Sequence, residues 1–237
     1  MITWKAARIR KRAAHAYQAM SASRLRHRDV FERFAKQHHL TFFSPDTPQR
    51  MLEMMDHERT EQTHGLLVGE HADYMTTVFS YTAKAHHFHF VPTEKAWMEV
   101  QIELLHATEL PFVYIGTRQQ TNTQYAELLS HHKDARYLHI SCPPALDKRF
   151  HERYAVLAAT EHAGYVRDLF TDSVVEALVD RHDTTAYHIE GNLVRVVTEL
   201  QKPRIQTLDR LFHTGLWMAK LVDDMYDDHN ETKNTAV

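Results

Sequence analysis

The chain has 237 residues, of which 43% are hydrophobic and 25% are charged, and its formal net charge is -3. This composition excludes a fibrous or intrinsically disordered chain, and the length is sufficient to bury a substantial core. The small negative net charge gives no overall reason to expect a nucleic-acid partner.

The cysteine content and the hydropathy pattern indicate the cellular compartment of the protein. Cys142 is the only cysteine, so no intramolecular disulfide can form, and a reducing compartment is favoured. No apolar run approaches the roughly 20 residues of a membrane-spanning helix, and the N-terminus lacks the apolar stretch of a signal peptide. We therefore expect a cytoplasmic protein without an integral membrane span.

Residues 1–28 form a basic segment that stands apart from the rest of the chain. It holds eight basic residues and no acidic one, and the first acidic residue is Asp29. The segment is rich in Ala and has no Pro or Gly, which predicts a helix. Its basic residues are Lys5, Arg8, Arg10, Lys11, Arg12, Arg24, Arg26 and Arg28.

The middle of the chain is predicted to form strands. Helical spacing continues to about Leu40, and a Pro-containing stretch at 43–48 then breaks it. From about Gly65 the period changes to that of strands, which are expected at 66–68, 74–81, 85–91, 97–104 and 112–115. Short helices are expected at 49–58 and 125–131. The short connections, such as 92–95, favour antiparallel neighbours.

The alternation is clearest at 97–104, which predicts a half-buried strand. The residues expected on its core face are Met98, Val100, Ile102 and Leu104. The residues expected on its polar face are Trp97, Glu99, Gln101 and Glu103.

The last third has its own order of elements. A strand is predicted at 154–158, helices at 163–170 and 172–179, and two short strands at 186–189 and 193–197 around a hairpin turn. A long amphipathic helix follows Pro203, with an apolar stripe that includes Leu208, Phe212, Ala219 and Val222. Gly215 inside this helix is explained by close packing on a sheet.

These elements predict an α+β fold, with an antiparallel sheet or sheets, helices packed on one face and a long C-terminal helix. The expected division is a basic helical segment at 1–28, an α+β domain at 29–226 with a subdivision near 117–149, and a polar tail at 227–237. Whether the two groups of strands share one sheet stays open.

Several segments between Val30 and Asp224 carry a family resemblance. They are Phe34–Phe42, Val78–Thr82, Glu109–Phe112, Phe150–Val156, Leu169–Asp172 and His188–Gly191. With these segments the chain resembles a family of uncharacterised bacterial, usually membrane-associated proteins of unknown function. The resemblance implies no known activity and carries no functional residues over. Members of that family often have hydrophobic spans upstream of this domain, where the present chain has the basic segment instead.

The chemistry-bearing pattern with the sharpest geometry is His87-x-His89. On a strand, residues two apart point to the same face, so the two imidazoles could bind zinc or iron with Glu99 as a third ligand. The alternative is that these histidines form the solvated face of an antiparallel sheet.

Two further features have a chemical and a structural interpretation. Cys142 is either a nucleophile beside a histidine or a small buried apolar residue. The acidic cluster near the end of the last helix either binds a divalent cation or belongs to a solvated terminus. The cluster consists of Asp223, Asp224, Asp227, Asp228 and His229.

The sequence contains no Gly-rich phosphate loop, no H-E-x-x-H, no paired C-x-x-C and no G-x-S-x-G. We therefore interpret the chain as a non-catalytic binding or scaffold domain, and expect no cofactor. The first alternative is a metal-dependent enzyme that uses the His-x-His strand.

The basic segment suggests an anionic partner. Trp4, Ile2, Ile9 and Tyr17 would enter a lipid interface while the Lys and Arg side chains meet headgroups, which predicts peripheral attachment to the inner face of the membrane. Another protein is an alternative partner. Nucleic acid bound through residues 1–28 is a less favoured one.

Overall fold

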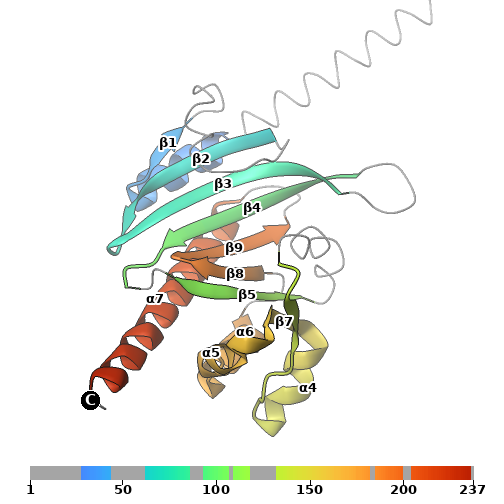
Figure 1. Cartoon of the computed structure of the whole chain (residues 1–237). Helices are drawn as coiled ribbons and strands as arrows, with labels where there is room; N and C mark the ends of the chain where they lie inside the picture. The colour runs from blue at the N-terminus through green and yellow to red at the C-terminus, as the bar shows by residue number, and fades with distance from the viewer. Residues whose placement is uncertain are drawn as a thin grey trace, which may run out of the picture.

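The computed structural model describes residues 28–43, 62–85, 93–106, 109–117, 132–181, 185–199 and 204–235. Within them, nine strands form one antiparallel sheet in the order β1-β2-β3-β4-β9-β8-β5-β7-β6 (Figure 1). The long helix α7 crosses one face of this sheet. The α+β fold with helices on one face and a long C-terminal helix is confirmed. The two groups of strands share one sheet, because β4 pairs with β9.

The elements have the following bounds. The strands are β1 (Thr41–Phe43), β2 (Gln62–His71), β3 (Tyr74–Ala85), β4 (Thr93–Glu103), β5 (Leu110–Thr117), β6 (Ala135–Leu138), β7 (Tyr154–Ala159), β8 (Thr185–Gly191) and β9 (Leu193–Glu199). The helices are a segment at 28–38, α4 (Pro144–Arg153), the 3-10 turn η1 (Thr160–His162), α5 (Ala163–Leu169), α6 (Asp172–Arg181) and α7 (Ile205–Thr235).

Most predicted elements are present, but the sequence analysis missed β1, β6 and α4. Strand β4 also begins at Thr93, within the connection expected at 92–95, and it pairs directly with β3 as far as Ala85. The strand predicted at 85–91, apart from Ala85, and the helices predicted at 49–58 and 125–131 lie outside the described residues.

The core is built on a row of side chains that crosses the whole sheet. In register from edge to edge, each strand contributes one apolar residue to the face that the helices cover. The row consists of Phe42, Leu67, Val78, Val100, Val196, Tyr187, Ile115, Val156 and Leu138. Its interior members are buried and only the two end residues are partly exposed, so one continuous apolar layer holds all nine described strands together.

The core face of β4 is as predicted, but its other face is not simply solvated. Met98, Val100 and Ile102 are fully buried. On the opposite face Trp97 is buried too, because it packs with Leu66 and Phe79 of the neighbouring strands in a second, small apolar cluster.

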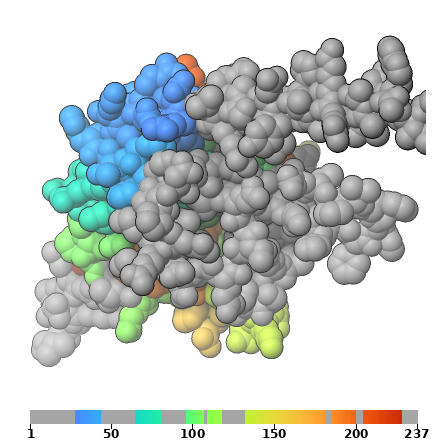
Figure 2. Space-filling view, turned by 90° about the horizontal axis from the view of Figure 1, so that it is seen from above, coloured from blue at the N-terminus to red at the C-terminus, as the bar shows by residue number. Residues whose placement is uncertain are grey.

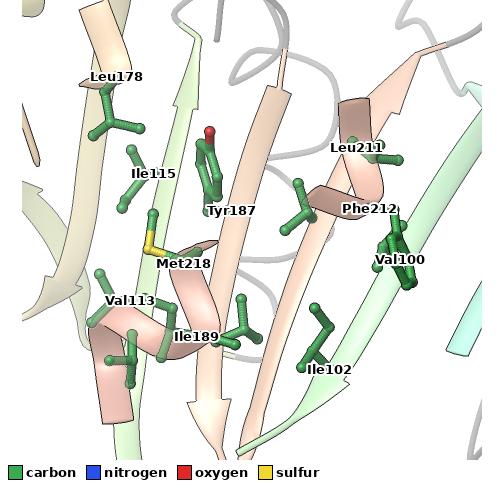
Figure 3. Close-up of a cluster of buried hydrophobic side chains, with 14 of the residues drawn as sticks. Val100, Ile102, Val113, Ile115, Leu178, Tyr187, Ile189, Leu211, Phe212 and Met218 are labelled. Atoms are coloured by element: carbon green, nitrogen blue, oxygen red, sulfur yellow. The ribbon is translucent and has the colours of Figure 1, made fainter. Parts of the chain in front are cut away.

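Helix α7 lies very close to strands β4 and β9. A Cβ atom at Gly215 would stand 2.9 Å from Cδ1 of Ile102 and 3.3 Å from Cγ1 of Val100, so only glycine fits without movement of these side chains. This confirms close packing on the sheet as the explanation of the glycine. The predicted apolar stripe is also confirmed, and Figure 3 shows Phe212 and Leu211 facing the sheet near Val100.

The helical segment 28–38 covers the β1–β2 end of the same face. Phe31 and Phe34 are fully buried there, and a Cβ at Gly65 of β2 would stand 3.2 Å from the Phe31 ring. Figure 2 shows residues 28–43 beside β2 and β3 at one end of the molecule. The glycine allows the aromatic ring to lie directly on the strand.

Replacement of Ile102 by Ala should lower the free energy of unfolding by about 2–5 kcal/mol, because a fully buried side chain is lost from under α7. Glu103→Ala, at the exposed next residue, should change it by less than about 0.5 kcal/mol. Urea unfolding of both variants measures the difference, and equal effects would contradict the assignment of the two faces.

Replacement of Gly215 by Leu should lower the free energy of unfolding by about 1–3 kcal/mol, because the added side chain overlaps Ile102 and Val100. The matched control is Gly164→Leu in α5, where a Cβ meets no atom within 4 Å. The control should be neutral or stabilising by up to about 1 kcal/mol, since Leu favours helix over Gly. A thermal melt that ranks the two variants the other way would refute the packing argument.

Candidate functional site

The structure places only part of the metal site predicted on the His-x-His strand. His87 and His89 lie outside the described residues. Glu99 is buried at 5% exposure, and the amide of Gln101 donates a 2.8 Å hydrogen bond to its Oε1 atom. The carboxylate expected as a third ligand thus already has a protein partner, and the metal site at these residues stays a prediction.

Of the eight basic residues predicted to meet an anionic surface, only Arg28 lies within the described residues. It lies in the helical segment 28–38 and forms an exposed ion pair with Glu32 one turn later, at 2.7 Å. Such exposed pairs stabilise a helix only slightly. The remaining residues, Lys5, Arg8, Arg10, Lys11, Arg12, Arg24 and Arg26, lie outside the described residues.

Cys142 has the surroundings of a structural residue. Burial, followed by the nearby charges of Asp147 and Asp172, raises the pKa of the thiol to about 11. Its Sγ atom donates to the carbonyl oxygen of Ile140 at 3.5 Å. A thiol with this pKa stays protonated at neutral pH, which disfavours the nucleophilic interpretation.

Asp223 serves neither of the two roles considered for the acidic cluster. It is 2% exposed, and its two carboxylate oxygens each accept a hydrogen bond at 3.1 Å, from the backbone N–H of Leu105 and of His106. The Tyr74 hydroxyl also donates a hydrogen bond to the Asp223 carboxylate. Burial, followed by the charge of this carboxylate, raises the pKa of Tyr74 to about 12. Asp223 therefore fixes the chain after β4 to α7. Of its neighbours, Asp224 is exposed and paired with Lys220.

A histidine and aromatic cluster joins segment 28–38 to α7 and to the end of β2. The buried His38 places Nε2 at 2.8 Å from Oδ1 of Asp209 on α7, and its ring lies 4.8 Å from the Phe212 ring. The His71 ring lies 5.6 Å from the His38 ring. Burial is the largest cause that lowers the pKa of His71, and the charge of His38 is the next. A backbone hydrogen bond to His38 acts in the opposite direction.

A second cluster, of His132, His188 and Glu190, lies on the sheet face opposite the helices. His188 and Glu190 are two residues apart on β8, and His132 precedes β6. The Oε2 atom of Glu190 lies 3.2 Å from Nε2 of His188 and 3.7 Å from Nε2 of His132. The contact with His188 is the largest cause that lowers the pKa of Glu190, and burial opposes it. The carboxylate is therefore ionised at neutral pH.

A third cluster contains Asp147 and His151 of α4 and His139, which precedes this helix. The two imidazole rings stack at 4.4 Å. However, Nε2 of His151 lies 2.9 Å from the carbonyl oxygen of Ile140. A carbonyl only accepts hydrogen bonds, so this nitrogen carries a proton and offers no lone pair to a metal.

The sequence analysis did not select His132, His188 and Glu190 as a site. It included Glu190 in a hairpin turn, and β8 and β9 do form that hairpin. The available signal was the spacing of His188 and Glu190, because residues two apart on a strand share a face. Nothing in the sequence indicated that His132 would lie beside them.

Neither a protein-family model nor a curated protein matches the chain. A solved structure is similar, that of the mycobacterial trehalose monomycolate transport factor A, TtfA, with a TM-score of 0.51 and 12% sequence identity. The alignment covers 83% of this chain and 92% of that chain. At this identity the likeness shows a shared fold and nothing about activity. Among the described residues, no helix has both the length and the apolar character needed to cross a membrane.

The lowered pKa of His71 predicts how stability depends on pH. The unfolded chain binds a proton at His71 near the ordinary pKa of 6.5, above the lowered folded value. His71 thus contributes its stabilisation above that pH and loses it as the pH falls through the folded value. We expect the urea midpoint of the wild type to fall more from about pH 7 to about pH 5 than that of His71→Gln.

Among the described residues, the titratable groups that act on His71 are His38, His39 and His213, and all three remain in the His71→Gln variant. His162→Gln on η1, outside this cluster, is the matched control and should keep the wild-type dependence. Identical pH profiles for His71→Gln and the wild type would show that His71 is not linked to stability.

Proposed function

We propose that the chain is a non-catalytic binding domain that attaches peripherally to an anionic membrane surface through residues 1–28. The observation that carries the proposal is the charge distribution. Eight of the 28 Lys and Arg residues, and none of the 31 acidic residues, lie in this segment. Each basic residue near an anionic leaflet contributes about 1 kcal/mol, so several together give reversible attachment without a spanning helix.

The folded part offers a firm support for such an attachment. The basic segment leads directly into the helical segment 28–38, which is fixed to α7 by the pair of His38 with Asp209 and by the edge-to-face contact of Phe34 with Phe212. The last basic residue of the segment, Arg28, thus belongs to an element that is packed onto the folded domain. The inner face of the cytoplasmic membrane is the proposed location.

Two comparisons support the same proposal. The solved structure with the shared fold is named as a transport factor for trehalose monomycolate and not as an enzyme. The sequence also resembles a family of membrane-associated proteins, and membership of that family is likewise proposed.

Co-sedimentation with vesicles tests the proposal. Full-length protein should pellet with vesicles that contain phosphatidylglycerol, not with pure phosphatidylcholine, and high salt should release it. The variant Arg10→Gln, Lys11→Gln, Arg12→Gln should bind about 100-fold more weakly, since it lacks three interactions of about 1 kcal/mol each. A chain that starts at Asp29 should not bind.

The matched control removes three exposed basic residues from the folded part, with Lys36→Gln, Lys133→Gln and Lys148→Gln, and should keep most of the binding. Full-length protein that ignores anionic vesicles at low salt, or equal binding by the chain from Asp29, would defeat the proposal. Binding to RNA in place of vesicles would support the rival anionic partner.

A further inference from the structure

The cluster of His132, His188 and Glu190 brings together side chains from two distant parts of the chain. His188 and Glu190 point to the same side of β8, away from the helices, because residues two apart on a strand share a face. His132 reaches the same place from the chain segment that leads into β6. Three potential ligands thus converge on one point of the sheet.

The spacing of the three ligand atoms suits a transition metal. They all lie within 4.8 Å of one another, and Glu190 Oε2 stands 3.2 Å and 3.7 Å from the two imidazole nitrogens. Ligands about 2.0–2.2 Å from a tetrahedral zinc ion are about 3.3–3.6 Å apart. Only small side-chain shifts are needed to enclose an ion.

His188 has a nitrogen that the described residues do not satisfy. Its Nε2 atom is buried, and within the described part of the chain it has no partner with hydrogen-bond geometry, although the Glu190 carboxylate is near. A buried polar nitrogen without a well-directed partner is costly. For an ion to bind beside Glu190, this nitrogen must release any proton that it shares with the carboxylate 3.2 Å away, so zinc binding should weaken at low pH.

Aromatic packing fixes the two imidazole rings. The Phe112 ring stacks on His132 at 3.7 Å and meets His188 edge to face at 5.1 Å. Phe112 in turn packs against the small apolar cluster of Tyr114, Leu157 and Ala186 on this face of the sheet. The rings are therefore held before any ion arrives, which lowers the entropic cost of binding.

We propose that His132, His188 and Glu190 bind a divalent transition metal ion, with zinc as the best fit. Two imidazoles and one carboxylate match the preference of zinc, whereas magnesium and calcium prefer sets of oxygen ligands. The Glu190 side chain is 45% exposed and that of His132 is 22% exposed, so the site is accessible from solvent and leaves a coordination position for water. None of the three proposed ligands belongs to residues 1–28.

Equilibrium dialysis of tag-free, full-length protein against zinc, with metal analysis, tests the site. Glu190→Gln keeps the shape of an exposed side chain and should leave the fold intact, yet it should weaken zinc binding about tenfold or more. His188→Ala should likewise lose the zinc ion bound at this site. Zinc should also raise the melting temperature of the wild type more than that of either variant.

Cobalt as a substitute provides an independent readout, because its visible absorption reports nitrogen and oxygen ligation directly. The matched control is His151→Ala, in the cluster whose nitrogen already donates to a carbonyl, and it should keep the cobalt spectrum of the wild type. Equal zinc content in the wild type, Glu190→Gln and His188→Ala would overturn the proposal, as would binding lost only in His151→Ala. Magnesium that displaces zinc at equal concentration would also overturn it.

Discussion

The close approach of α7 to the sheet is the contact on which the rest of the structure depends. A sheet whose helices all lie on one face needs a continuous cover for its apolar side, and α7 supplies it over β4 and β9. A side chain larger than hydrogen at Gly215 would force Ile102 and Val100 to move in the layer between α7 and the sheet. Because Leu208 and Phe212 are fully buried on the same helix, such a displacement would loosen much of the core at once.

Two carboxylates on α7 extend this contact to the chain on either side. Asp209 pairs with His38 of the N-terminal helical segment. Asp223 accepts hydrogen bonds from two backbone N–H groups of the residues that follow β4. The helix thus fixes the point from which the basic segment departs. The histidine cluster around His188 lies on the opposite face of the sheet from α7.

The elements that the sequence predicts well are those in which one face is buried. Period-two alternation revealed β4, and helical spacing revealed α7, because burial of one side imposes the repeat. The three residues of β1 and the four residues of β6 are too few to show a period, and α4 buries only Phe150, so the sequence analysis missed all three elements. Nothing in the sequence distinguished the buried Asp223 from its exposed acidic neighbours. His132 lies beside His188 because of the tertiary fold. The spacing of residues along a single strand cannot reveal such a contact.

The described sheet ends in its two shortest strands, since β1 has 3 residues and β6 has 4. An open sheet of this width would otherwise present long rows of free backbone N–H and C=O groups at its margins. Such rows invite a strand from another copy of the chain and lead to aggregation. Short margins, one of them carrying the exposed Arg136, leave little room for a foreign strand to pair. We therefore expect these short margins to limit edge-to-edge association between copies of the chain at high protein concentration.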